Sequence, residues 1–268
     1  YGHHLDLVSP LMQADILAVS ELSEVRKLRK LSGKPILLLP GVFNENDLHE
    51  AIDLGCHLVL HELSQLTIIA NSKQAISVWL KVDTGMHRLG LSQQDLATCL
   101  TQLKNHSNIH IECVMSHFAC ADEPGHQKNT QQLDHFNQLK ISEISRSMAN
   151  SAAILSLEES HFNYVRPGIM LYGASPFSTI DEQLLPVMEL SAPVISLKKI
   201  SAGESAGYGA TWQAKEATNI AIIGIGYGDG YPRHAKNGTP VLINNTLCSL
   251  AGRVSMDLIC VDIGNLNV

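Results

Sequence analysis

Short apolar runs alternate with longer amphipathic stretches over the first two thirds of the chain. The apolar runs are rich in Ile, Leu and Val and are typical of buried strands. We predict strands at Ile16–Ser20, Pro35–Pro40, His57–His61, Ile76–Val82, Ile111–His117 and Val165–Tyr172. The stretches between them have helical spacing, which predicts helices at Glu21–Leu31, Asn46–Leu54, Leu63–Ser72, Ser92–Lys104 and His126–Arg146. Expected caps and helix ends are Asn44, Ser92, Gly33 and Gly55.

Repeated strand–helix units imply a parallel sheet, and their number favours a (β/α)8-type barrel over an open sheet. From about Leu185 the pattern changes to strand-like runs separated by turns. These runs are Pro193–Ile200, Ala217–Ile225, Val241–Ile243, Leu247–Ala251 and Leu258–Ile263. We therefore predict an α/β barrel over residues 1–184 and a mostly β C-terminal domain over residues 185–268.

The composition, 45% hydrophobic and 17% charged, is that of an ordinary globular protein. A net charge of -7 without a basic block argues against a nucleic-acid partner. The six cysteines form no Cys-x-x-Cys pair and are expected to be reduced, which indicates a cytoplasmic protein. We find neither a membrane-spanning apolar stretch nor a signal-peptide pattern. Because the chain opens on Tyr1 rather than Met, we expect a piece of a longer protein.

The first candidate site lies where the run Ile76–Val82 ends in a polar motif, Lys81 to Gly90. Chemistry in α/β barrels lies at the carboxyl ends of the strands. Lys81 and Arg88 are both cations, and bringing two cations together is unfavourable unless an anion lies between them. His117 and Arg166 also follow apolar runs, so an anionic ligand would explain the set. The alternative is a strand, a turn and solvated surface residues.

Two further turns are candidates for holding a phosphate. Asn150 and Ser151 open a helix-like run, where a hydroxyl and free N–H groups bind anions, although a plain N-cap has the same pattern. The turn from Arg166 through Gly168 and Ile169 offers more N–H groups, or is a simple loop. In barrels of this type the phosphate site often lies on the last loops.

The β-rich part contains a tyrosine, Tyr208, between two glycines, either projecting its ring or forming a flexible turn. The glycine-rich segment 224–230 lacks the residues of a P-loop or a dinucleotide fingerprint. The chain has 13 histidines but no zinc-ligand spacing, so no metal site is expected.

Seven motifs, taken in order, resemble those of the alanine racemases, pyridoxal-phosphate isomerases built from a TIM barrel and a β domain. The motifs are KVDTGMHRLG (81–90), SHFA (116–119), NSAA (150–153), VRPGIMLYG (165–173), GYGATW (207–212), GYGDGYPR (226–233) and GRVSMD (252–257), with Tyr1-Gly2-His3 at the start. Together they span the whole chain. The resemblance implies interconversion of L- and D-alanine by two-base proton transfer on substrate held by pyridoxal 5'-phosphate. It also implies D-alanine supply for peptidoglycan.

The resemblance also assigns roles. Tyr208 would be one base, acting on the partner's barrel in a homodimer, with His117 hydrogen-bonded to it. Arg166 would face the cofactor's pyridine nitrogen. Arg88 would contact the cofactor phenolate and the substrate carboxylate, and Lys81 would be carbamylated to hold Arg88 in place. The remaining residues would bind the cofactor (Tyr1, Asn150, Ser151, Gly168, Ile169) or the substrate (Met256 through its N–H, Asp257, and Tyr227 near the entry).

One departure from the family pattern concerns the lysine that attaches the cofactor. In the family it lies four residues before the Tyr-Gly-His at which this chain begins, and no other lysine here has that context. We therefore expect a barrel without its first strand, and no appreciable racemisation by the chain as given. The alternatives are a broad-specificity amino-acid racemase, a non-enzymatic pyridoxal-phosphate-binding barrel and a metal-dependent barrel hydrolase.

Overall fold

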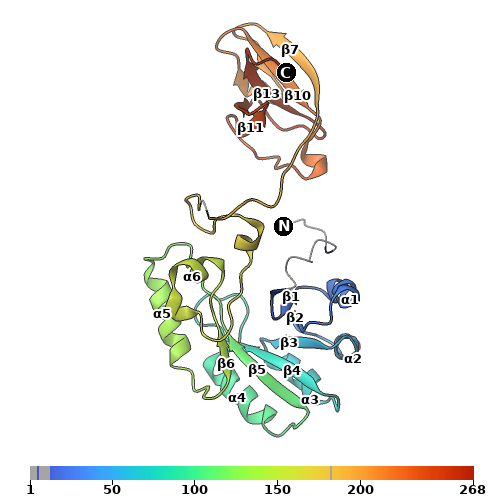
Figure 1. The fold of residues 1–268 in the computed structure, drawn as a ribbon, viewed down its shortest axis with the longest axis vertical. Coiled ribbons are helices and arrows are strands. Elements are labelled where there is room, and N and C mark those ends of the chain that lie inside the picture. Colours follow the sequence, from blue (N-terminus) through green and yellow to red (C-terminus); the bar gives the residue numbers. More distant parts are fainter. Residues whose placement is uncertain (1–4, 6–12, 182) are drawn as a thin grey trace. The chain divides into compact units, whose positions relative to one another are not determined.

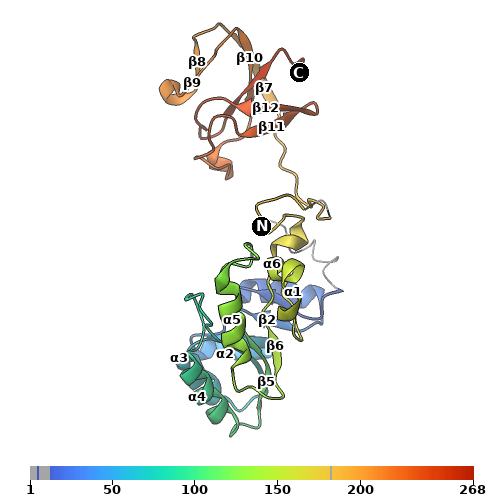
Figure 2. The ribbon, with the colours of Figure 1, turned by 90° about the vertical axis from the view of Figure 1, so that its left-hand side faces the viewer.

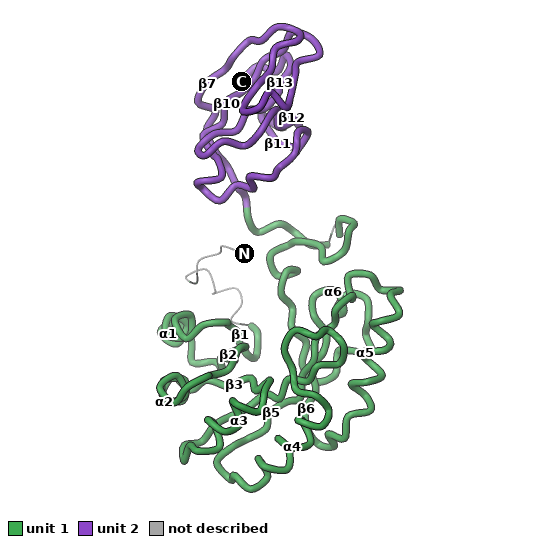
Figure 3. The backbone as a smooth tube through the Cα atoms, turned by 180° about the vertical axis from the view of Figure 1, so that it is seen from behind, with its two compact units in different colours: residues 1–188 green, residues 189–268 purple. Residues whose placement is uncertain are grey.

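The structure is a computed structural model that describes residue 5 and residues 13–181 and 183–268. Contacts within the chain divide it into two compact units, Tyr1–Met188 and Glu189–Val268 (Figure 3). The predicted phosphate ligand Tyr1 lies outside the described residues.

The first unit is built on a parallel six-stranded sheet in the order β1-β2-β3-β4-β5-β6 (Figure 1). The strands are β1 (Leu17–Val19), β2 (Ile36–Leu38), β3 (Cys56–Leu60), β4 (Ile76–Lys81), β5 (Ile109–Met115) and β6 (Ser145–Ser147). The helices between and after them are α1 (Leu22–Leu31), α2 (Glu45–Asp53), α3 (Leu63–Ala70), α4 (Gln93–Leu103), α5 (Gln127–Asn137) and α6 (Ser151–Ser156). The curved sheet is a half-barrel, which confirms the predicted fold class (Figure 2).

The two faces of this sheet follow from the alternation of side chains along each strand. One face packs against the helices, where Leu58, Val78 and Leu80 are fully buried with helix residues such as Val25 and Ile69. The opposite face forms a separate cluster of buried side chains, namely Leu37, Val59, Trp79, Cys113 and Met115. Both faces are therefore apolar, and this is why the strands read as continuous apolar runs.

Three of the four predicted helix boundaries have the expected chemistry. The Asn44 side chain accepts a hydrogen bond from the N–H of Asp47, and Ser92 accepts one from Asp95, so both are N-caps. Gly55 follows α2 with a φ of 65°, a conformation in which glycine is unstrained. The end of α1 differs, because the chain leaves through an extended Ser32 and Gly33 has no special conformation.

The sixth strand is where the sequence prediction was wrong. Val165–Tyr172 is a loop followed by a 3-10 turn at Ile169–Tyr172, and β6 is the polar segment Ser145–Ser147. Pro167 has no N–H to contribute to a ladder, which disfavours a strand here. The predicted helix His126–Arg146 accordingly ends early, at Asn137 of α5.

The second unit is an antiparallel sheet in the order β11-β12-β13-β10-β7, with a separate two-stranded ribbon. The five strands are β7 (Val194–Ile200), β10 (Thr218–Ile223), β11 (Pro240–Ile243), β12 (Thr246–Leu250) and β13 (Ile259–Gly264). All five predicted strands are confirmed. The ribbon pairs β8 (Ser205–Ala206) with β9 (Trp212–Gln213), and Ala221, Leu250 and Val261 lie at the centre of this unit's apolar core.

All six cysteines are free thiols, four of them buried. Burial raises the pKa of Cys113 to about 12 and that of Cys56 and Cys99 to about 11, so these thiols are unreactive at neutral pH. Among the described helices, none combines the length and apolar content that crossing a bilayer requires.

Candidate active site

The loop after β4 is organised by the carboxylate of Asp83. Its Oδ1 accepts hydrogen bonds from the N–H groups of Gly85 (2.9 Å), Met86 (3.0 Å) and His87 (3.1 Å). Burial alone would raise the pKa of this carboxyl, but the hydrogen bonds from Gly85 and His87 outweigh it and lower the pKa. The aspartate of the Asp-Thr-Gly motif therefore stabilises its own loop by accepting hydrogen bonds from three backbone N–H groups.

The same loop is closed at its base. The Leu91 N–H donates to the Lys81 carbonyl at 2.8 Å, and the Asp83 N–H donates to the Leu91 carbonyl at 3.0 Å. Gly90 has a φ of 146°, and a Cβ there would lie 2.4 Å from the Asp83 nitrogen, so only glycine fits. The closed loop carries Arg88 near its tip, exposed and without a hydrogen-bond or ion-pair partner among the described residues.

Arg166 is held by backbone and hydroxyl oxygens at the carboxyl ends of β5 and β6. Its guanidinium donates to the Ser147 hydroxyl and to the Ser116 carbonyl, and reaches the Met148 carbonyl at 3.4 Å. Burial lowers the pKa of Arg166 to about 10, so the group stays protonated at neutral pH. No carboxylate among the described residues pairs with it. The site therefore holds a fixed cation that lacks a counter-ion.

His117 lies beside this cation, with its Nδ1 at 3.4 Å from a guanidinium nitrogen of Arg166. A guanidinium only donates hydrogen bonds, so Nδ1 accepts and the ring proton sits on Nε2. Burial first, and then the charges of Arg166, Arg88 and Lys81, lower the pKa of His117 to about 3. The imidazole is therefore neutral, and the positive charge at this point belongs to Arg166.

Lys81, at the end of β4, shares this electrostatic environment. Burial, followed by the charges of Arg88 and Arg166, lowers the pKa of Lys81, while Asp83 opposes the shift. Lys81, Arg88 and Arg166 thus interact electrostatically at one end of the half-barrel, whereas His117, which the sequence grouped with them as a possible cation, is neutral. An anion placed among them would relieve their repulsion.

The second predicted ligand set, around Ser151, also comes together. The Ser151 hydroxyl is buried and accepts hydrogen bonds from the N–H groups of Gly168 (2.8 Å) and Met170 (3.4 Å). Both lone pairs are used in this way, which leaves the hydroxyl proton to donate. The Ile169 N–H opens a 3-10 turn and has no acceptor among the described residues, while the Asn150 side chain caps the helix that follows. A hydroxyl and an N–H with protons to spare suit a phosphate.

In the second unit, Tyr208 projects from a turn that needs its glycines. Gly207 and Gly209 have φ values of 75° and 72°. A Cβ on Gly209 would lie 3.4 Å from the Arg253 guanidinium, and one on Gly252 would lie 2.5 Å from the Ala206 carbonyl oxygen. The two loops therefore pack closely, and Tyr208 remains 71% exposed.

A pocket of about 1000 Å³ adjoins this tyrosine within the second unit. Its lining includes Tyr208, Tyr227, Met256 and three cationic side chains, Arg233, Lys236 and Arg253. The Arg233 guanidinium lies 5.6 Å from the Tyr227 ring centroid, a cation–π contact. The Met256 N–H has no acceptor among the described residues, so it is available to a ligand, and Asp257 is exposed beside it. Three residues predicted for proton transfer and substrate binding, Tyr208, Tyr227 and Met256, thus line one surface.

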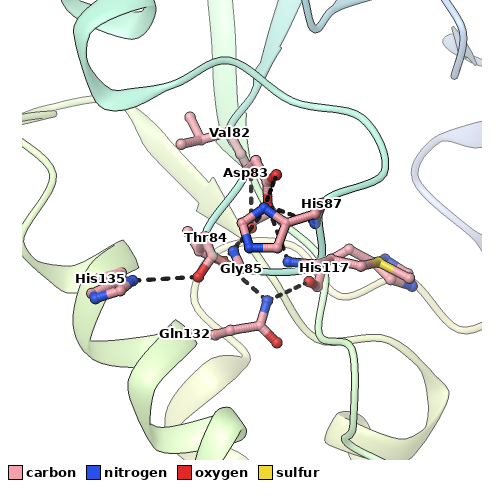
Figure 4. A network of polar contacts seen from close by, with 10 residues as sticks. Val82, Asp83, Thr84, Gly85, His87, His117, Gln132 and His135 are labelled. Carbon is pink, nitrogen blue, oxygen red and sulfur yellow. Dashed lines mark hydrogen bonds and ion pairs between the residues drawn. The ribbon is translucent and has the colours of Figure 1, made fainter.

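Sequence reasoning missed the polar contacts beneath the barrel site. Thr84, Ser116, Ser147 and Gln132 are all buried, and their side chains link the loops that carry Arg88, His117 and Arg166. Figure 4 shows the contacts of Gln132 with Thr84 and His117. One signal was present in the sequence. Gln132 occupies the stripe of α5 that also buries Asn129 and Phe136, where an apolar residue is expected.

A parallel half-barrel with cations and hydroxyls at the carboxyl ends of its strands belongs to the class of α/β-barrel proteins that bind anionic ligands at that end. Comparison with known families specifies the class further. "Alanine racemase, N-terminal domain" matches residues 1–176, and "Alanine racemase, C-terminal domain" matches residues 187–268. The chain belongs to the alanine racemase family, as its motifs predicted.

Individual relatives agree. An alanine racemase of Vesicomyosocius okutanii is 60% identical over 267 residues, which cover 99% of this chain and 76% of that protein. One from Pseudoalteromonas atlantica is 43% identical, covering 99% and 75%. The crystal structure of biosynthetic alanine racemase from Pseudomonas aeruginosa superposes with a TM-score of 0.93 at 41% identity, covering 99% of this chain and 77% of that one. A Bartonella henselae alanine racemase structure with covalently bound pyridoxal phosphate gives 0.85 at 28%, covering 95% and 73%.

Proposed function

We propose that the protein is a pyridoxal-phosphate-dependent isomerase that interconverts L- and D-alanine and supplies D-alanine for peptidoglycan. The observation that carries the proposal is the uncompensated cation Arg166, fixed beside a neutral His117 at the end of a half-barrel whose relatives are alanine racemases. Bound pyridoxal phosphate would supply an electron sink for the charge left at the substrate Cα when its proton departs. The chain's own residues bind, orient and exchange protons around that sink.

The turn around Ser151 suits the phosphate, because the Ser151 hydroxyl and the Ile169 N–H both have protons to donate. Arg166 suits the pyridine nitrogen: a guanidinium keeps its proton, so it donates a hydrogen bond without protonating the ring. An unprotonated ring withdraws electrons moderately. We propose that this limits side reactions other than proton exchange at Cα.

Tyr208 is the group we propose for proton exchange on one face of the substrate. A phenol needs a neighbouring positive charge to give up its proton near neutral pH. Because His117 is neutral, the charge at that position is Arg166, and His117 would pass its influence to the phenol through Nε2–H.

Arg88 would bind the substrate carboxylate and the cofactor phenolate, which fits its exposed guanidinium and free donors. We propose that Lys81 is carbamylated. Its lowered pKa favours the neutral amine, which attacks the carbon of CO2, forms an N–C bond and releases one proton. The product is an anion that faces two cations, Arg88 and Arg166, and it would hold Arg88 in place.

The finer assembly follows from the family. We propose a cytoplasmic homodimer in which Tyr208, Met256, Asp257 and Tyr227 of one subunit serve the barrel of the other; the free thiols and the exposed Tyr208 ring support this.

Incubation of the full-length protein, loaded with pyridoxal phosphate, with L-alanine in deuterated water tests the proposal. We expect D-alanine to accumulate with deuterium at Cα, because a proton exchanged by a side chain equilibrates with solvent. Serine and lysine, offered separately, should turn over far more slowly. Absence of D-alanine, or D-alanine that keeps its original proton in every turnover, would refute the proposed function.

A further inference from the structure

The buried amide of Gln132 joins two loops of the barrel site. Gln132 projects from α5 and is only 1% exposed. Its Nε2 donates to the Thr84 hydroxyl (3.2 Å) and to the His117 carbonyl (2.9 Å) (Figure 4). Its Oε1 accepts from the Ala119 N–H (2.9 Å). The Gln132 side chain therefore bonds to the backbone at both ends of the segment 117–119. It also bonds to Thr84 in the loop after β4.

Hydrogen-bonding capacity fixes the direction of the contacts beyond Thr84. Ser116 Oγ donates its single proton to the Val82 carbonyl at 2.9 Å. It must therefore accept from Thr84, whose oxygen lies 2.8 Å away, and Thr84 in turn accepts from Gln132. The hydrogen bonds run in one direction, from Gln132 through Thr84 and Ser116 to the carbonyl of Val82, the residue that follows β4.

The same residues contact the catalytic cation. The Ser116 carbonyl accepts from the Arg166 guanidinium, and His117, whose carbonyl is held by Gln132, presents Nδ1 to Arg166. On the other side, a Cβ at Gly85 would lie 3.4 Å from Cγ of Gln132, so the loop that carries Arg88 packs on this side chain. Displacement of the amide would therefore loosen both loops at once.

A second buried glutamine shows what a purely structural amide looks like in this fold. Gln65 of α3 is fully buried, donates to the Pro40 carbonyl at 2.8 Å and accepts from the His61 N–H at 2.9 Å. It joins the loops after β2 and β3 in the way that Gln132 joins those after β4 and β5. None of its partners contacts Arg166 or His117.

We propose that Gln132 is a positioning residue for His117 and Arg166, acting through Thr84, Ser116 and the backbone of residues 117–119. The expected effect on racemisation rests on the proposed function, whereas the expected effect on the position of the His117 ring does not. Misplacement of a reacting group by about 1 Å costs on the order of 100-fold in rate, and this sets the expected effect.

The test compares Gln132→Leu with Gln65→Leu, and with Gln131→Leu, an exposed neighbour on α5. Imidazole nitrogen NMR of the full-length protein without substrate reports the ring of His117 directly. We expect the wild-type ring to be neutral, with its proton on Nε2, and Gln132→Leu to shift the Nδ1 signal. In racemisation assays the same variant should lower kcat by about 10- to 100-fold with little change in KM, and should move the pH profile.

Replacement of Thr84 supplies the conservative rescue. Thr84→Ser keeps the hydroxyl and should retain wild-type kcat, whereas Thr84→Val removes it and should behave like Gln132→Leu. Gln65→Leu should lower stability but leave the His117 signal and the pH profile unchanged. An unaltered His117 signal in Gln132→Leu, or equal changes in Gln65→Leu, would overturn the proposal. The NMR comparison needs no alanine, so its outcome stands even if racemisation is absent.

Discussion

Ser151 is the residue on which the proposed phosphate site most directly depends. Its hydroxyl accepts from two N–H groups and has one proton to donate. Replacing it with alanine leaves those N–H groups unpaired and removes a donor to the anion, which should weaken pyridoxal-phosphate binding by about 1–3 kcal/mol. The matched control is Ser156→Ala, because the Ser156 hydroxyl only caps a carbonyl of the same helix, Ala152.

Titration of the apoprotein with pyridoxal phosphate, followed by absorbance, measures this difference. Equal affinities for Ser151→Ala and Ser156→Ala would remove Ser151 from the phosphate site.

His117 makes stability depend on pH in a direction that its environment fixes. Burial and neighbouring cations lower the pKa of His117 from 6.5 to about 3. Between these values the unfolded chain binds a proton that the folded chain does not. The contribution of His117 to the free energy of unfolding is therefore fully present above pH 6.5 and is lost as the pH drops towards 3, by up to about 1.4 kcal/mol per pH unit.

Urea unfolding followed by the fluorescence of Trp79, in a Trp212→Phe background, measures this slope for the first unit. His117→Asn should give a shallower slope over the same range. His57 and His61, whose pKa values burial also lowers, contribute equally to both proteins. Identical slopes would mean that His117 titrates normally in the fold.

At the scale of elements, the loop from Asp83 to Leu91 depends on glycine. Gly90→Ala would place a Cβ 2.4 Å from the Asp83 nitrogen at a φ of 146°, and strain of this kind costs about 1–3 kcal/mol. The loop should open, and the displaced Arg88 should raise KM for alanine. Gly125→Ala is the control, because a Cβ there meets nothing within 4 Å. Hydrogen exchange at the amides of residues 85–91 should rise only in Gly90→Ala; equal protection would show that the loop tolerates the change.

The elements show which parts of the fold the sequence could predict. Strands β1 to β5 were predictable because both sheet faces bury apolar side chains, which gives continuous runs such as Leu58–Leu60. Strand β6 was not predictable, because Ser145–Ser147 is polar. It is held in place by pairing with β5 and by hydrogen bonds of the Ser147 hydroxyl to the Tyr164 carbonyl and Arg166. The signal for that strand is tertiary, so no local pattern could contain it.

The candidate site divides in the same way. Lys81, His117 and Arg166 were found because they follow apolar runs or stand in recognisable motifs. Gln132 and Thr84 were not: the position of Gln132 on the buried stripe of α5 was a signal, but a single sequence does not show which partners such a residue bonds to. Their role is visible only in the structure, where Gln132 bonds to Thr84, a residue 48 positions away in the sequence.

At the scale of the whole molecule, the proposed racemase needs residues from both units. Lys81, Arg88, His117 and Arg166 belong to the half-barrel, whereas Tyr208 and Met256 belong to the β unit. We propose that the two sets meet across a dimer interface. Each variant that removes one set would then inactivate both sites of a homodimer, but a mixed dimer would keep one intact site.

Co-expression of two single variants is the most direct test of this account. Tyr208→Phe removes the proposed base, and Arg88→Met removes the proposed substrate ligand at an exposed position where folding is spared. Each alone should lower alanine racemisation at least 100-fold, on the order expected for loss of a general base. Randomly mixed dimers should recover about a quarter of wild-type activity, because half of them carry one intact site out of two. Undiminished racemisation by Tyr208→Phe, or no recovery in the mixture, would contradict the account.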